Sequence, residues 1–162
     1  MTETTPATIT VTTLTPHIAC RNAEEAIEFY QKAFGAQLLM KMNIPGDGRV
    51  IHADLSIDGA RFYVVDEFPE QGGKSPQALG GSPVMLSLQV EDCDAVFAKA
   101  IEAGCTVQMP LADMFWGDRW GLLVDPYGHS WSISTPKQRL TAEEIREQMS
   151  TIDMSAGCGS PA

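Results

Sequence analysis

The chain has 162 residues, enough for one domain with a sizeable core. Hydrophobic residues make up 44% of the sequence and charged residues 20%, a balance typical of a folded globular protein. Acidic residues outnumber basic ones by 21 to 11, and the net charge of −10 argues against binding to nucleic acid or to an anionic membrane surface. No apolar run approaches the roughly 20 residues of a membrane-spanning helix, and the N-terminus does not resemble a signal peptide. We therefore expect a soluble, cytoplasmic single domain.

The first elements are expected between residues 13 and 68. Residues 1–12 are rich in threonine and poor in apolar side chains, which indicates a flexible N-terminal arm. A helix should begin after Asn22, where Glu25 completes a capping-box pattern, and Gly35 should end it. Strands are expected at 14–20, 38–43, 50–57 and 61–65.

The same order of elements returns between residues 84 and 136, after a linker at 69–83 that is rich in glycine, proline and serine. Asp92 should cap a helix that Gly104 ends. Strands are expected at 84–90, 106–109, 120–124 and 130–134, with Asp125-Pro126-Tyr127-Gly128 as a turn.

An internal repeat with an offset of 69 residues supports this reading. Ala26-Ile27 aligns with Ala95-Val96, and Gly35-Ala36 aligns with Gly104-Cys105. Two βαβββ modules therefore lie in one chain, which is an α+β architecture. One helix cannot cover both faces of a four-stranded sheet, so we expect the modules to pack together and leave a concave sheet face.

The remaining segments carry less information. A C-terminal helix is expected over 137–149, because Thr141 and Glu144 have the spacing of a capping box. Residues 150–162 should be disordered. Cys20, Cys93 and Cys105 lie in apolar patterns and should be buried free thiols, whereas Cys158 should be exposed.

Several motifs resemble those of the vicinal oxygen chelate superfamily, which includes glyoxalases, bleomycin-resistance proteins and dioxygenases. The motifs are Ala26-Ile27-Glu28-Phe29-Tyr30 with Phe34-Gly35-Ala36, Phe115-Trp116-Gly117-Asp118-Arg119 with Gly121, and Asp125-Pro126-Tyr127-Gly128-His129 with Trp131. The resemblance covers residues 13–136 and is strongest to an uncharacterised glyoxalase-like, demethylubiquinone-methyltransferase-like subgroup. It implies tandem βαβββ modules with curved half-barrel sheets, and a homodimer.

Enzymes of this superfamily hold a divalent metal with ligands from the first and last strands of each module. The resemblance places these positions at Thr15 or His17, at Tyr63 or Val64, at Met85 and at Ser132. Thr, Tyr, Met and Ser side chains do not form a site for Zn²⁺, Ni²⁺, Mg²⁺ or Mn²⁺. No cofactor is therefore expected. The alternative is a divalent metal held by a non-standard set of ligands.

The three histidines lie in different predicted elements. His17 lies on a strand expected to line the concave face, where it is either a hydrogen-bonded residue of the pocket or a metal ligand. His52 and Asp54 share one face of a strand and could join His17, although alternating polar residues also occur on any solvated sheet face. His129 follows a tight turn and is interpreted as structural.

An aromatic patch around Asp118 and Arg119 is the other candidate site. Trp116 and Trp120 flank this pair and could stack on a flat ligand, while the guanidinium of Arg119 holds an anionic group. The alternative is an internal ion pair between Asp118 and Arg119 that stiffens the last hairpin.

Two functions remain open, and no catalytic residue is identified. The first is a binding protein that sequesters an aromatic or anionic small molecule in the concave sheet. The second is a metal-dependent lyase, isomerase or dioxygenase centred on His17 and His52. The expected ligand-binding residues are His17, His52, Tyr63, Trp116, Asp118, Arg119, Trp120 and Ser132.

Overall fold

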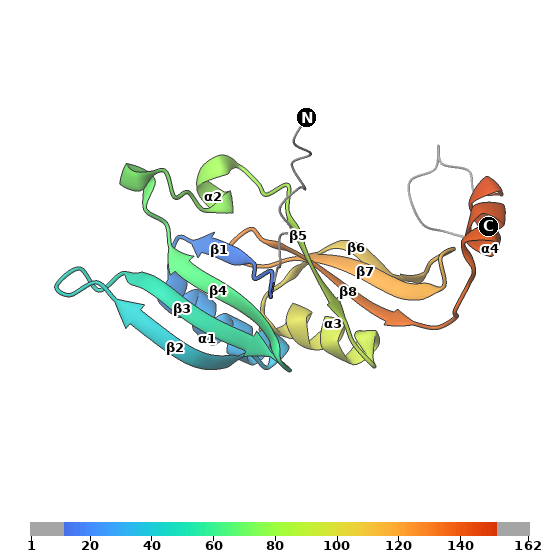
Figure 1. Cartoon of the computed structure of the whole chain (residues 1–162), viewed down its shortest axis with the longest axis horizontal. Helices are drawn as coiled ribbons and strands as arrows, with labels where there is room; N and C mark the ends of the chain where they lie inside the picture. The colour runs from blue at the N-terminus through green and yellow to red at the C-terminus, as the bar shows by residue number, and fades with distance from the viewer. Residues whose placement is uncertain (1–11, 152–162) are drawn as a thin grey trace, which may run out of the picture.

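The computed structural model describes residues 12–151, which form two four-stranded sheets with one helix packed on each (Figure 1). In the first sheet the strand order is β1-β4-β3-β2; β1 runs parallel to β4, and the other neighbours are antiparallel. Its elements are β1 (His17–Cys20), α1 (Ala23–Phe34), β2 (Gln37–Asn43), β3 (Val50–Ile57) and β4 (Ala60–Asp66).

The second sheet repeats this topology in the order β5-β8-β7-β6, with β5 parallel to β8. Its elements are β5 (Met85–Gln89), α3 (Cys93–Ala103), β6 (Thr106–Asp113), β7 (Asp118–Val124) and β8 (Ser130–Pro136). The expected α+β fold of two βαβββ modules is thus confirmed. No helix within residues 12–151 is long and apolar enough to span a bilayer.

Local sequence signals explain where the two main helices begin and end. The side chain of Asn22 accepts a hydrogen bond from the Glu25 backbone N–H, and Asp92 does the same for Ala95. Gly35 ends α1 with a φ of 69°, a left-handed conformation that favours glycine.

Other boundaries differ from the expected ones. Strand β6 continues to Asp113 through Pro110, which an edge strand tolerates because one side of its backbone needs no partner. The segment 69–83 contains a 3₁₀ turn, η1 (Pro69–Gln71), and a short helix, α2 (Pro76–Leu79).

The C-terminal helix α4 (Ala142–Ser150) begins at Ala142 rather than at residue 137, because the predicted Thr141–Glu144 capping box forms its first turn. Ser150 ends this helix instead of starting the predicted tail. The rest of that tail with Cys158, and the predicted N-terminal arm up to residue 11, lie outside the described residues.

One hydrophobic core joins the modules. Helices α1 and α3 pack against each other. Trp131 of β8 packs against the rings of Tyr30, Phe34 and Phe62 from the first module, at centroid distances of 5.6, 4.7 and 5.8 Å. Cys20, Cys93 and Cys105 are buried free thiols, as predicted.

A buried carboxylate, Asp125, ties the modules together in the turn between β7 and β8. Tyr30 Oη and Trp131 Nε1 both donate to Asp125 Oδ2, at 2.8 and 2.9 Å. The backbone N–H groups of Tyr127 and His129 donate to Oδ1, each at 2.9 Å. The ring of His129 contacts the carbonyl oxygen of Ala19 at 3.0 Å, which confirms its structural role.

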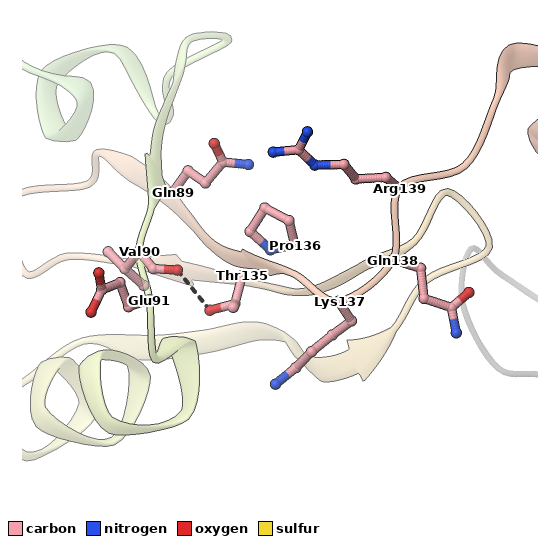
Figure 2. A pocket seen from close by; sticks show the side chains of 8 residues that line it. All are labelled: Gln89, Val90, Glu91, Thr135, Pro136, Lys137, Gln138 and Arg139. Carbon is pink, nitrogen blue, oxygen red and sulfur yellow. Dashed lines mark hydrogen bonds between the residues drawn. The ribbon is translucent and has the colours of Figure 1, made fainter.

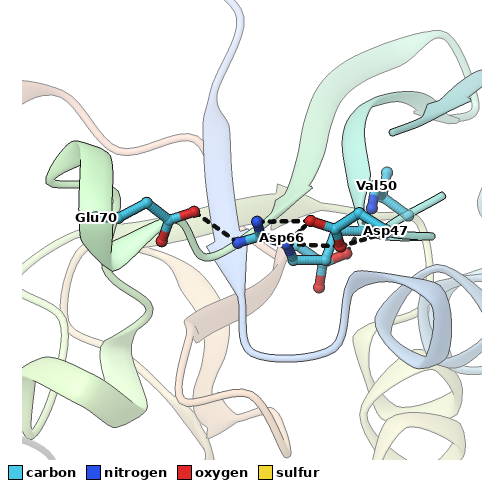
Figure 3. A network of polar contacts seen from close by, with 5 residues as sticks. Asp47, Val50, Asp66 and Glu70 are labelled. Carbon is cyan, nitrogen blue, oxygen red and sulfur yellow. Dashed lines mark hydrogen bonds and ion pairs between the residues drawn. The ribbon is translucent and has the colours of Figure 1, made fainter. Parts of the chain in front are cut away.

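The internal repeat extends to how each helix is anchored. Asp66, at the end of β4, accepts a hydrogen bond from the backbone N–H of Ala23 at 2.9 Å and another from that of Val50 at 2.6 Å; Figure 3 shows Asp66 and Val50. Thr135, at the 69-residue offset, accepts one from Cys93 at 2.9 Å. A side chain from the last strand therefore holds the first turn of the helix in both modules.

We predict that Asp125→Asn lowers the free energy of unfolding by about 2–4 kcal/mol. The NH2 group of the new side chain would face the Nε1–H of Trp131, and two donors cannot form a hydrogen bond with each other. Urea unfolding followed by circular dichroism measures the change. Glu102→Gln, which removes one charge from the exposed side of α3, serves as the control. A loss for Asp125→Asn no larger than that of the control would contradict the anchoring role.

Candidate functional site

Each sheet has one face covered by its helix and one open face. Side chains alternate between the faces along a strand, and directly paired residues share a face. In the first sheet, Ile18, Phe62 and Val64 are buried beneath α1. His17 pairs with Tyr63 and therefore lies with it on the opposite face, which we call the first open face.

Three rings gather on the first open face. The ring centroids of His52 and Tyr63 are 4.7 Å apart, those of His17 and Tyr63 5.8 Å, and those of His17 and His52 6.3 Å. The structure thus brings together three of the predicted site residues. Partial burial, and secondly the neighbouring His52, lower the pKa of His17 below its ordinary value. The neutral imidazole of His17 is favoured near neutral pH.

The metal positions implied by the resemblance are occupied by poor ligands. Asp54, on the same face as His52, is buried and paired with Arg61, whose Nε donates to Asp54 Oδ1 at 3.1 Å. Among residues 12–151, no group of three or more His, Cys, Asp or Glu side chains is arranged to hold a metal ion. Two imidazoles beside a phenol do not fit a divalent metal site, because such a site takes at least three good donors.

The second open face carries hydroxyl, amide and indole groups. Ser132 of β8 donates to Ser87 of β5 through its hydroxyl at 2.8 Å. Gln89, Ser134 and Trp120 form a cross-strand row on β5, β8 and β7, because Ser134 pairs with both of the others. The rings of Trp116 and Trp120 meet edge to face at 6.1 Å.

Arg119 does not belong to this face. Its guanidinium pairs with Asp94 of α3, through Nε and Nη2 each at 2.8 Å, and reaches Asp113 at 3.3 Å. The alternative interpretation, an ion pair between Asp118 and Arg119, is wrong, because consecutive strand residues point to opposite faces and Arg119 points toward the helix. Trp116 and Trp120 remain together, but without this guanidinium between them.

A second arginine, which sequence reasoning missed, lies near the second open face. Arg139, Gln89 and Pro136 line an open pocket of about 590 Å³ at the ends of β5 and β8 (Figure 2). Residues 137–139 were expected to be helical, and a helix there gave no reason to place Arg139 beside the sheet. Hydrogen bonds from the backbone N–H groups of Lys137 and Gln138 to Gly117 O, both 2.9 Å, hold this segment against the hairpin instead.

Comparisons with known proteins agree with this fold. Residues 9–133 match the family model described as the Glyoxalase/Bleomycin resistance protein/Dioxygenase superfamily. The uncharacterized protein Mb0911c of Mycobacterium bovis is 45% identical over 142 residues, which cover 85% of this chain and 92% of that protein. Protein YjdN of Escherichia coli is 28% identical over 79% of this chain and 98% of its own.

Solved structures give the same result. TioX from Micromonospora sp. ML1 superimposes with a TM-score of 0.60 at 26% identity, over 76% of this chain and 97% of its own. A Bacillus cereus PhnB protein, provisionally named as a 3-demethylubiquinone-9 3-methyltransferase, superimposes with a TM-score of 0.59 at 25% identity, over 75% of this chain and 98% of its own.

The lowered pKa of His17 gives a testable pH dependence. In the folded protein, His17 should titrate below the ordinary value of about 6.5, so stability should fall as the pH drops from that value toward the folded pKa. His52→Gln removes the smaller of the two causes and should raise the midpoint of His17, which two-dimensional NMR of the imidazole signals measures. Lys99→Gln, which removes an exposed charge from α3, should leave the titration midpoint of His17 unchanged. An unchanged midpoint in His52→Gln would contradict the coupling.

Proposed function

Because the chain belongs to the glyoxalase/bleomycin resistance protein/dioxygenase superfamily, we propose that it binds a flat small molecule on the second open face. The observation that carries the proposal is the placement of Trp120. Its indole is half-buried, lies on the uncovered face of β7 and has Trp116 edge-on beside it. An exposed indole face stacks on flat ligands, and Ser87 and Ser134 offer hydroxyl groups on the same face, whereas the buried Ser132 hydroxyl is already donated to Ser87.

The proposed site is completed by a second copy of the chain. Apolar side chains are unusually exposed on and beside the open faces: Met40 is 45% exposed, Met42 48% and Met85 47%. Met42 pairs with His52 on the first open face, and Met85 pairs with Ser130 on the second. A two-fold pair of chains would cover these methionines and place the first open face of one copy across from the second open face of the other.

We predict a homodimer of about 35 kDa, twice the 17.6 kDa of one chain. Met42→Glu should shift light scattering toward the monomer mass, because two-fold pairing would bury the new charge against apolar side chains. Leu79→Glu is the matched control, since Leu79 is 63% exposed and belongs to α2 rather than to a strand of either sheet. A wild-type mass of 17.6 kDa at micromolar concentration would refute the dimer.

We infer that binding needs no metal, because the donors around His17 and His52 do not complete a metal site. The second candidate function, a metal-dependent lyase, isomerase or dioxygenase, is favoured only by the approach of these two imidazoles to within 6.3 Å. The two functions differ in what chelation does to stability and to ligand binding.

Prolonged chelation should therefore move the melting temperature by less than about 2 °C, whereas a metal at 100 times its dissociation constant would add about 2.7 kcal/mol of stability, or several degrees. On the chelated protein, flat aromatic fragments should perturb the indole N–H signal of Trp120 and leave that of buried Trp131 in place.

Trp120→Leu should weaken binding of these fragments at least tenfold, because the stacking surface is lost. Arg119→Lys should bind them like the wild type, since Arg119 lies on the helix side of β7. A large drop in melting temperature on chelation, reversed by one divalent ion, would replace the binding function by the metal-dependent one.

A further inference from the structure

The pocket at the end of the second open face is framed by polar donors. Figure 2 shows the Gln89 amide and the Arg139 guanidinium extending toward each other above Pro136. Lys137 also lines the pocket, but its ammonium points away from Arg139 in Figure 2. Glu91 lines the opposite end, away from Arg139, where it would repel an anion. The Arg139 end is therefore the part of the pocket suited to a negative group.

Arg139 differs from most arginines of the chain in having no carboxylate partner among the described residues. Arg21, Arg49, Arg61 and Arg119 each form at least one ion pair there. In a chain with a net charge of −10, carboxylates are plentiful, so a guanidinium without one beside a pocket is unusual. Arg146, the other arginine without a carboxylate partner among the described residues, lies on α4 and does not line this pocket.

The backbone that carries Arg139 is well anchored. Gly117 O accepts hydrogen bonds from Lys137 and Gln138, and a Cβ at Gly117 would lie 2.6 Å from Gln138 O, so only glycine permits this approach. Thr135, just before the segment, donates to Val90 O of the neighbouring connection at 2.9 Å. The backbone immediately before Arg139 is therefore held in place beside the hairpin.

The pocket is continuous with the proposed ligand face. Gln89 and Trp120 lie in one cross-strand row with Ser134 between them. Adjacent strands are about 4.8 Å apart, so the backbones of Gln89 and Trp120 are separated by about 10 Å. A small aromatic molecule that carries an acidic substituent spans such a distance.

We propose that Arg139 and Gln89 form an oxyanion subsite that holds the carboxylate or phosphoryl group of a ligand whose flat part lies against Trp120. The planar guanidinium donates two parallel hydrogen bonds to such a group, and the Gln89 amide adds a third donor. This subsite rests on the proposed function, since it gives that same ligand face its preference for acidic aromatic molecules.

The test compares charged and neutral probes of the same shape at fixed ionic strength. Sodium benzoate, benzamide and inorganic phosphate are titrated into the full-length protein and followed by two-dimensional NMR of the Trp120 indole, the Gln89 side-chain amide and the Arg139 Nε–H. The variant is Arg139→Gln. Arg146→Gln removes the same charge from α4 and is its matched control.

Benzoate should bind the wild type at least tenfold more tightly than benzamide, and Arg139→Gln should remove this preference while Arg146→Gln keeps it. Phosphate should shift the Gln89 amide in the wild type but not in Arg139→Gln. Equal loss in both variants would indicate a general charge effect and overturn the subsite, as would unchanged benzoate binding in Arg139→Gln.

The two proposals fail in different ways. If benzoate and benzamide bind equally and both perturb the Trp120 indole, the oxyanion subsite is wrong and the ligand face stands. If phosphate shifts Gln89 in an Arg139-dependent way while no probe perturbs Trp120, the subsite stands and the proposed ligand face is wrong.

Discussion

The carboxylate of Asp125 is the interaction on which the arrangement of this molecule depends. A buried charge is costly unless donors surround it, and Asp125 receives four: one side chain from the first module, one from β8 and two backbone N–H groups of its own turn. Tyr30 reaches it from α1, so the first helix is fixed against the last hairpin. The helices thereby lie together in the core, and the opposite sheet faces are left uncovered.

This arrangement gives the two faces of each sheet different chemistry. The helix side of β7 carries Leu123, which is fully buried, and Arg119, whose charge is matched by Asp94. The open side carries Trp120, whose indole is only half-buried and is not part of the hydrophobic core. Groups on the helix side are engaged in core packing and ion pairs, so the ligand binding that we propose uses the open side of the sheet. In this proposal Arg139, at the end of the sheet, supplies the guanidinium that Arg119 does not.

Much of the fold was predictable because its signals are local. Helix caps such as Asn22 and Asp92, and the glycine that ends α1, act within a few residues of themselves. The repeat with its 69-residue offset supported the βαβββ order of elements along the chain. The partner of Arg119 was not predictable, because Asp94 lies 25 residues earlier on another element. Arg139 was missed for a related reason: its position depends on hydrogen bonds from Lys137 and Gln138 to Gly117, which is distant in the sequence.

The two modules keep the same scaffold but not the same surface. Asp66 and Thr135 anchor the helices in equivalent ways, although one is a carboxylate and the other a hydroxyl, because each needs only an acceptor for a backbone N–H. No such requirement constrains the open faces, and there the modules have diverged into imidazole and phenol groups on one side and hydroxyl and indole groups on the other. In the proposed two-fold dimer, the first open face of each copy would lie across from the second open face of the other copy, which would give two equivalent sites. Each resulting site would combine a neutral imidazole such as His17 with an indole and an arginine, a set of groups suited to a flat, acidic molecule.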